Sequence, residues 1–118
     1  LYSPYFPYIY KYLIIKLMQI MKLTETEVIQ RLKDLDGWQQ QSSSLQKLYI
    51  FKDFATTVTF INLIVPVADG MNHHPDIRIY GWNKLEITVT THDHGGITHL
   101  DFELAGKIDT LMKGFSNV

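Results

Sequence analysis

Cysteine is absent from this chain of 118 residues. Without a thiol the chain can form no disulfide, offers no thiolate nucleophile, and lacks a common ligand of structural zinc sites. Because a cysteine-free composition is compatible with a reducing compartment, we expect a cytoplasmic protein.

A strong charge of one sign is missing too, since the formal net charge is only −1 and the basic residues are dispersed. Nucleic-acid binding requires a concentrated basic surface, so we expect no nucleic-acid partner. The apolar start of the chain, residues 1–20, is interrupted by Lys11 and Lys16 and lacks the order of a secretory signal. It is too short and too interrupted to span a bilayer, so we also expect no membrane partner.

Residues 1–20 nevertheless differ from the rest of the chain, because they carry five of its seven tyrosines. The whole length is typical of a single domain. We therefore predict an appended segment over residues 1–20 and one domain over residues 21–118, beginning at Met21. The alternative is a tail that binds a membrane surface or a protein partner.

The remaining sequence alternates between helical and extended hydrophobic spacing. Thr24 and Glu27 fit a capping box at the start of a helix that we expect to end at Gly37. Apolar residues at helical spacing indicate two further helices, and alternating or apolar runs indicate strands. The predicted helices are 24–37, 54–70 and 100–111. The predicted strands are 45–52, 77–80 and 84–91, and residues 39–44 form a short edge strand or its turn.

This order, α-β-β-α-β-β-α, joins the strands in pairs through short connections. We predict an α+β fold with a four-stranded antiparallel sheet and three helices on one face. The helix over 54–70 is apolar around more than half of its circumference. Such breadth indicates burial on two sides, under the sheet or against another subunit.

The histidines are concentrated in one segment, between Asn72 and Asp101. They stand in the series His73-His74-Pro75-Asp76 and Thr90-Thr91-His92-Asp93-His94, and at His99. Histidine changes charge near neutral pH, so a cluster can hold a proton donor beside a proton acceptor. Pro75 restricts the backbone there and so fixes the directions of the two adjacent imidazoles. The alternative is that one histidine caps a helix and the other is simply exposed.

Carboxylates accompany this cluster. Asp69 lies about one helical turn before His73 and can orient its imidazole. Asp101 either complements the dipole of the last helix or orients His92. Trp38 is either a core anchor, which the sequence favours, or an aromatic wall for a flat ligand.

A metal site is the other chemistry that these histidines suggest. His92 and His94 are two residues apart, a spacing that a metal ion can use. Adjacent imidazoles such as those of His73 and His74 chelate one ion poorly, and no thiolate or His-Glu-x-x-His helix is present. We therefore predict no metal. We expect the side chains of His94 and His99 to lie on the surface of the turn at Gly95-Gly96.

The chain resembles the pterin-4a-carbinolamine dehydratase family over residues 23–112. The motifs that carry the resemblance are Asp69-x-x-x-His73-His74-Pro75-Asp76, Thr90-Thr91-His92-Asp93, Gly95-Gly96-Ile97-Thr98 and Asp101 with Leu104-Ala105. The resemblance implies the fold predicted above and a lyase that dehydrates 4a-hydroxytetrahydropterin (4a-hydroxytetrahydrobiopterin) to the quinonoid dihydropterin. It implies histidine general acid/base catalysis without a cofactor, and a homodimer or homotetramer.

The resemblance also assigns roles to residues of this sequence. The implied catalytic set is His73, His74 and His92. The implied substrate-binding residues are Asn72, Pro75, Thr90, Thr91 and Asp93, and the supporting residues are Asp69, Asp101 and Trp38. Some relatives act instead as assembly proteins or transcriptional coactivators, so a non-catalytic binding protein of the same fold is the alternative.

Overall fold

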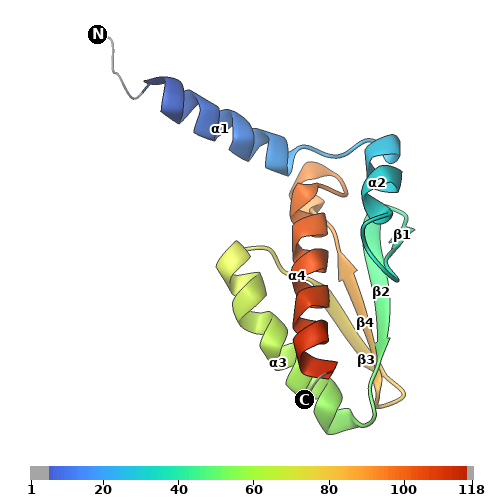
Figure 1. Cartoon of the computed structure of the whole chain (residues 1–118). Helices are drawn as coiled ribbons and strands as arrows, with labels where there is room; N and C mark the ends of the chain where they lie inside the picture. Colours follow the sequence, from blue (N-terminus) through green and yellow to red (C-terminus); the bar gives the residue numbers. More distant parts are fainter. Residues whose placement is uncertain (1–5, 117–118) are drawn as a thin grey trace.

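The computed structural model describes residues 6–116, and Figure 1 shows how their elements are arranged. The helices are α1 (Phe6–Ile20), α2 (Glu25–Leu32), α3 (Phe54–Met71) and α4 (His99–Ser116), with a short 3-10 helix η1 (His92–His94). The strands are β1 (Gln39–Gln41), β2 (Ser44–Ile50), β3 (Asp76–Tyr80) and β4 (Lys84–Val89). The strands form one antiparallel sheet in the order β1-β2-β4-β3, which makes β1 and β3 its edges.

The predicted α+β class and the four-stranded antiparallel sheet are confirmed. α3 and α4 cover one face of the sheet (Figure 1). Leu85, Ile87 and Val89 of β4 point into this core and are fully buried, while the residues between them are half-buried. The predicted alternation of inward and outward side chains is therefore confirmed in β4. α2 adds Val28 to the same core.

The first predicted helix is shorter than expected. Its capping box between Thr24 and Glu27 is present, but α2 ends at Leu32 rather than at Gly37. Beyond Leu32 the N–H groups of Asp34 and Leu35 bond to carbonyls three residues back, so the chain tightens into turns. Gly37 then takes a φ of 79°, which ends the segment.

Two strands are also shorter than predicted. β2 ends at Ile50 because Asp53 leaves the sheet to cap α3, where its carboxylate accepts the Thr56 N–H at 2.7 Å. β4 ends at Val89, and the chain beyond it forms one isolated bridge between Thr91 and a glycine.

Asp109 on α4 ties the helix to the sheet. Its carboxylate accepts the Trp38 indole N–H at 3.0 Å and the Lys47 ammonium at 2.9 Å, and it also accepts the Tyr49 hydroxyl. Burial and this carboxylate raise the pKa of Tyr49 above its ordinary range. Trp38 is 5% exposed and anchors the core, as the sequence favoured.

α1 stands apart from the rest of the fold. Figure 1 shows it projecting away from the domain, with its last turn beside the start of α4. The projection makes the molecule 62 Å long but only 28 and 23 Å across. Residues 1–5 of the predicted appended segment lie outside the described residues, and the boundary at residue 21 stays a prediction.

α3 is the one described helix that is long and apolar enough, by length and composition, to cross a membrane. A core helix passes the same test, and α3 buries Phe60, Ile64 and Ala68 against the sheet. Its other side remains exposed along a stripe that includes Phe54, Val58 and Val65. The predicted two-sided apolar character is therefore present, with the sheet covering one side.

Candidate active site

A left-handed turn at the end of α3 positions the adjacent histidines. Asn72 caps the helix with φ 49° and ψ 40°, a conformation that asparagine tolerates better than most residues. The Asn72 N–H bonds to the carbonyls of Ala68 and Asp69, and the His73 N–H bonds to Ala68 at 3.1 Å. Asn72 thus closes the helix, and the chain reverses direction just before the two imidazoles.

His73 points inward to a buried carboxylate. Its Nε2 lies 2.7 Å from Oδ1 of Asp101, and the side chain of His73 is 10% exposed while that of Asp101 is fully buried. The other oxygen of Asp101 accepts the Thr91 hydroxyl at 2.9 Å and the Thr98 N–H at 2.8 Å. Three donors therefore satisfy the buried carboxylate, which holds the His73 ring in one orientation.

His74 points outward and has a carboxylate of its own. Its Nε2 lies 2.8 Å from Oδ1 of Asp69, and both side chains are more than half exposed. This pair borders a hollow of about 150 Å³, which is lined by Ile61, Ile64, Val65, Ala68, Asp69, His74, Pro75 and Ile77. The two neighbouring histidines thus sit in opposite environments, one enclosed and one at a rim.

The third histidine of the predicted set comes from a different element. His92 opens η1 and is exposed, and its side chain makes no hydrogen bond within residues 6–116. Thr91, the residue before it, is bonded through its hydroxyl to Asp101. The buried carboxylate therefore joins the His73 ring to the base of the turn that carries His92.

Of the remaining predicted residues, one is buried and joins two segments of the backbone, and the others are half-buried or exposed. Thr90 is buried, and its hydroxyl donates to the Ser43 carbonyl at 2.7 Å, which fastens the end of β4 to the β1–β2 turn. Pro75 is half-buried immediately before β3. Asn72 and Asp93 are exposed. Among residues 6–116, no three histidine or acidic side chains are grouped so that they could hold a metal ion.

The carboxylate partners differ from those predicted. Asp69 was expected to orient His73, but it pairs with His74. Asp101 was expected either to complement the start of the last helix or to orient His92; it accepts the Thr98 N–H at the start of α4, and the histidine that it contacts is His73. The reason is the left-handed turn at Asn72, because it carries His73 toward α4 and returns His74 toward the last turn of α3.

The prediction that His99 lies on the surface of the turn at Gly95-Gly96 is wrong. His99 begins α4, and its Nδ1 lies 2.8 Å from the Arg31 guanidinium on α2. Thr98, which our candidate set omitted, supplies both a hydroxyl and an N–H to the site network. The signal was present in the sequence, since Thr98-x-x-Asp101 has the spacing of a helix capping box.

These contacts determine which nitrogen of each histidine carries the proton when the ring is neutral. An ionised carboxylate only accepts hydrogen bonds, so Nε2 of His73 and Nε2 of His74 each carry a proton that is donated to an aspartate. Nδ1 is then the nitrogen of each ring that does not face the carboxylate. A buried aspartate behind a histidine holds this tautomer and stabilises the imidazolium that forms when Nδ1 is protonated.

The fold and the site define a class: α+β domains that place carboxylate-held histidines at the end of a four-stranded antiparallel sheet. Residues 21–111 match the family model described as pterin 4 alpha carbinolamine dehydratase. The chain therefore belongs to the pterin-4a-carbinolamine dehydratase family, as the sequence motifs indicated.

Curated relatives support the same membership. A protein of Sulfurisphaera tokodaii named "Putative pterin-4-alpha-carbinolamine dehydratase" is 50% identical over 91 residues, which cover 77% of this chain and 97% of that protein. A protein of Sulfolobus acidocaldarius with the same name is 43% identical, with coverage of 77% and 99%. The family similarity thus extends over nearly the whole length of these relatives.

Solved structures agree in fold. A crystal structure of a "transcriptional coactivator/pterin dehydratase" from Brucella melitensis is 33% identical with a TM-score of 0.71, and the match covers 76% of this chain and 97% of that one. A pterin dehydratase-like protein identified as a RuBisCO assembly factor has a TM-score of 0.50 at 23% identity, with coverage of 63% and 84%. The second likeness concerns the fold alone.

Proposed function

We propose that the chain is a hydro-lyase that removes water from a 4a-hydroxytetrahydropterin, such as 4a-hydroxytetrahydrobiopterin, and releases the quinonoid dihydropterin in the cytoplasm. The proposal rests on two histidine–aspartate pairs in a member of the dehydratase family. His73 is paired with the buried Asp101, and the next residue, His74, is paired with the exposed Asp69. Such an arrangement suits proton transfer to and from a small heterocycle at a rim.

The proposed reaction is an elimination with no change of oxidation state. The bond between carbon 4a and its hydroxyl oxygen breaks, and an imidazolium gives that oxygen a proton so that it leaves as water. A neutral imidazole takes the proton from the adjacent ring nitrogen, whose electrons form the new double bond to carbon 4a. Each proton transfer contributes typically about 10² to 10⁴ in rate. No cofactor enters this balance.

The catalytic residues of the proposal are His73, His74 and His92. His73 and His74 exchange protons at Nδ1, because their Nε2 atoms are held by aspartates. Asp101 and Asp69 are positioning residues, since each acts through the histidine that it orients.

In the proposal, the pterin binds residues whose polar groups are exposed to solvent in the free protein. Asn72 and Asp93 are exposed beside the histidines in sequence, and Pro75 lines the hollow next to His74. The hydroxyls of Thr90 and Thr91 are engaged by Ser43 and Asp101, so the two threonines would shape the pocket and offer backbone groups.

We also propose that the protein works as a homo-oligomer. The outer side of α3 exposes Phe54, Val58 and Val65, which recur with Ile61 at helical spacing and form an apolar stripe. An exposed stripe of this kind marks a protein contact more often than bare surface. The stripe leads to the hollow beside His74, so a second subunit there would border the proposed site.

The test is a direct assay of carbinolamine breakdown by the purified protein. Wild type should exceed the spontaneous rate, and His73→Ala or His74→Ala should lower the catalysed rate by about 10²-fold or more. His94→Ala is the matched control, because His94 is an exposed histidine of η1 outside the catalytic set. If the wild type never exceeds the spontaneous rate and a protein partner co-purifies, the chain is a binding or assembly protein instead.

A further inference from the structure

The family similarity leaves α1 unexplained, since the matched residues begin at 21. Nine large apolar or aromatic side chains of α1 are each at least 37% exposed. They are Tyr8, Ile9, Tyr10, Tyr12, Leu13, Ile14, Ile15, Leu17 and Met18. Exposed apolar surface on this scale marks a place where another surface binds.

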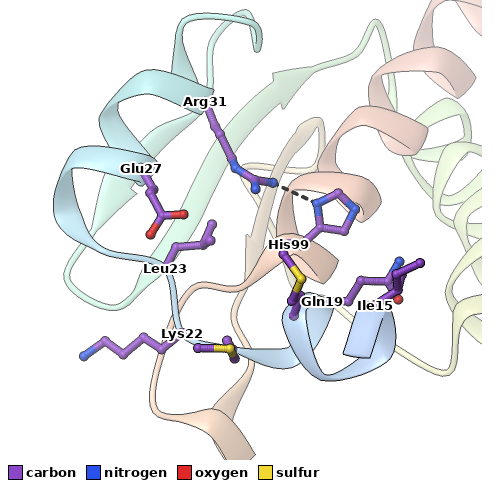
Figure 2. A pocket seen from close by; sticks show the side chains of 9 residues that line it. Ile15, Gln19, Lys22, Leu23, Glu27, Arg31 and His99 are labelled. Atoms are coloured by element: carbon purple, nitrogen blue, oxygen red, sulfur yellow. Dashed lines mark hydrogen bonds between the residues drawn. The ribbon is translucent and has the colours of Figure 1, made fainter. Parts of the chain in front are cut away.

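The side of α1 that faces away from the domain is its most apolar side. Ile15, Met18 and Gln19 line a cavity that the last turns of α1 form with α2 and the start of α4 (Figure 2). At 100° per residue, Leu13 and Leu17 lie on the opposite side of the helix, and Ile9 continues their stripe one turn earlier. An apolar stripe of α1 therefore faces outward, while the opposite side of the helix faces the domain.

The charged residues of α1 itself are all lysines. The chain contains no acidic residue before Glu25, while Lys11, Lys16 and Lys22 fall in that stretch. At 100° per residue, Lys11 lies on the half of the helix that is opposite the outward stripe, whereas Lys16 lies at the edge of the stripe, 60° from Leu13. An exposed apolar helix that carries lysines and no acidic residue suits an anionic membrane surface, because a lysine at the edge of the apolar stripe can extend its ammonium group to the lipid headgroups.

The cavity at the root of α1 adds to this positive charge. Its volume is about 370 Å³, and Figure 2 shows Arg31 reaching across it to His99, with 2.8 Å between Nη1 and Nδ1. Within residues 6–116, Arg31 makes no ion pair with a carboxylate. Glu27 also lines the cavity, but its carboxylate is held by the N–H and hydroxyl of Thr24. With Lys22, the cavity has two cations against one anion.

We propose that α1 is an interfacial helix that docks the domain on an anionic lipid surface. The helix is about 22 Å long, which is shorter than the roughly 30 Å of a hydrocarbon core, so it lies on the membrane and does not cross it. Pairing α1 with α1 of a second copy is disfavoured, because it would gather the lysines of both copies without an acid from either segment. From the sequence we expected no membrane partner, and a tail over residues 1–20 that binds a membrane surface was the alternative.

The experiment measures co-sedimentation of the full chain with vesicles. Binding should be strong with phosphatidylcholine mixed with phosphatidylglycerol, weak with phosphatidylcholine alone, and reduced by added salt. Lys11→Gln/Lys16→Gln should weaken binding to the anionic vesicles by roughly thirtyfold. Lys33→Gln/Lys52→Gln removes the same charge from exposed positions of the domain and should leave binding nearly unchanged.

A second pair of variants tests the apolar stripe. Leu13→Ser/Leu17→Ser should abolish sedimentation with the vesicles, whereas Ile29→Ser/Ile50→Ser, at comparably exposed positions elsewhere, should not. Thermal unfolding of all variants checks that the domain is intact. Absence of wild-type binding to anionic vesicles overturns the proposal. So does a solution mass that falls on Leu13→Ser/Leu17→Ser substitution, because a second copy would then cover the stripe.

Discussion

His73 and Asp101 are 28 positions apart in the sequence, yet Nε2 of the histidine lies 2.7 Å from Oδ1 of the buried aspartate. The aspartate belongs to the first turn of α4, and the histidine follows the last turn of α3. The bond therefore ties together the two helices that cover the sheet. The same carboxylate holds Thr91 and Thr98, so one buried charge organises three segments of the site.

Asp101→Asn should separate the proposed positioning role of this carboxylate from its structural role. The amide oxygen can still accept the Thr98 N–H, but the amide nitrogen then faces His73 and forces its Nε2 to become an acceptor. The proton of the neutral ring then moves to Nδ1, and in this tautomer Nδ1 can no longer accept a proton. We expect kcat to fall by about 10² to 10⁴-fold with little change in KM.

Asp101→Ala is the companion variant. It leaves the Thr91 hydroxyl, the Thr98 N–H and His73 without their shared acceptor, so the free energy of unfolding should fall by about 3 kcal/mol. The asparagine variant should lose clearly less stability. Nitrogen NMR of the imidazole should show the tautomer change in Asp101→Asn, and an unchanged tautomer would contradict the assigned role.

Asp69→Asn should have a weaker effect than Asp101→Asn. The Asp69 carboxylate and the His74 ring are both more than half exposed, so water competes for the contact and salt screens it. We expect a loss of activity several-fold smaller than for Asp101→Asn and almost no change in thermal stability. Rate measurements at low and high salt check this, since a wild-type advantage that persists undiminished at high salt would argue against an exposed pair.

The sequence predicted the elements better than it predicted the contacts between them. Hydrophobic period and capping patterns placed the helices and strands, because these signals are local. The partner exchange between Asp69 and Asp101 depends on the left-handed conformation of Asn72, which no hydrophobic period encodes. Similarly, the contact between Arg31 and His99 joins residues 68 positions apart, so only the packing of α2 against α4 creates it.

Val58→Glu should disrupt the proposed oligomer. Val58 lies in the exposed stripe of α3 and is 37% exposed, so a glutamate is tolerated in an isolated chain but would bury a charge in a subunit contact. We expect the mass measured by light scattering to fall toward that of one chain. Ile29→Glu on α2, also at an exposed position, should keep the wild-type mass. A monomeric wild type would refute the interface.

Asp109→Ala should destabilise the fold without reaching the proposed site. It removes the acceptor of the Trp38 indole and the Tyr49 hydroxyl, and an orphaned buried donor costs about 1 to 3 kcal/mol. We expect a lower free energy of unfolding in urea, with kcat retained at temperatures where the variant remains folded. Loss of kcat in a folded variant would show that this end of α4 is coupled to the histidines.

The cap of α3 should make stability depend on acid pH. Hydrogen bonds from Thr56 hold the pKa of Asp53 below its ordinary value of 3.8. A folded pKa below the unfolded one means that the carboxylate stabilises the fold above the unfolded value and loses that contribution as pH falls through the folded value. Asp53→Ala should therefore lower Tm at neutral pH, and the deficit should narrow below about pH 3.8. Asp53→Asn keeps a neutral cap, so its Tm should lack this acid-dependent component. Thermal unfolding followed by circular dichroism across this range is the measurement. A wild-type advantage over Asp53→Ala that stays constant into strong acid would show that ionisation of the Asp53 carboxyl group contributes nothing to the stability of the cap.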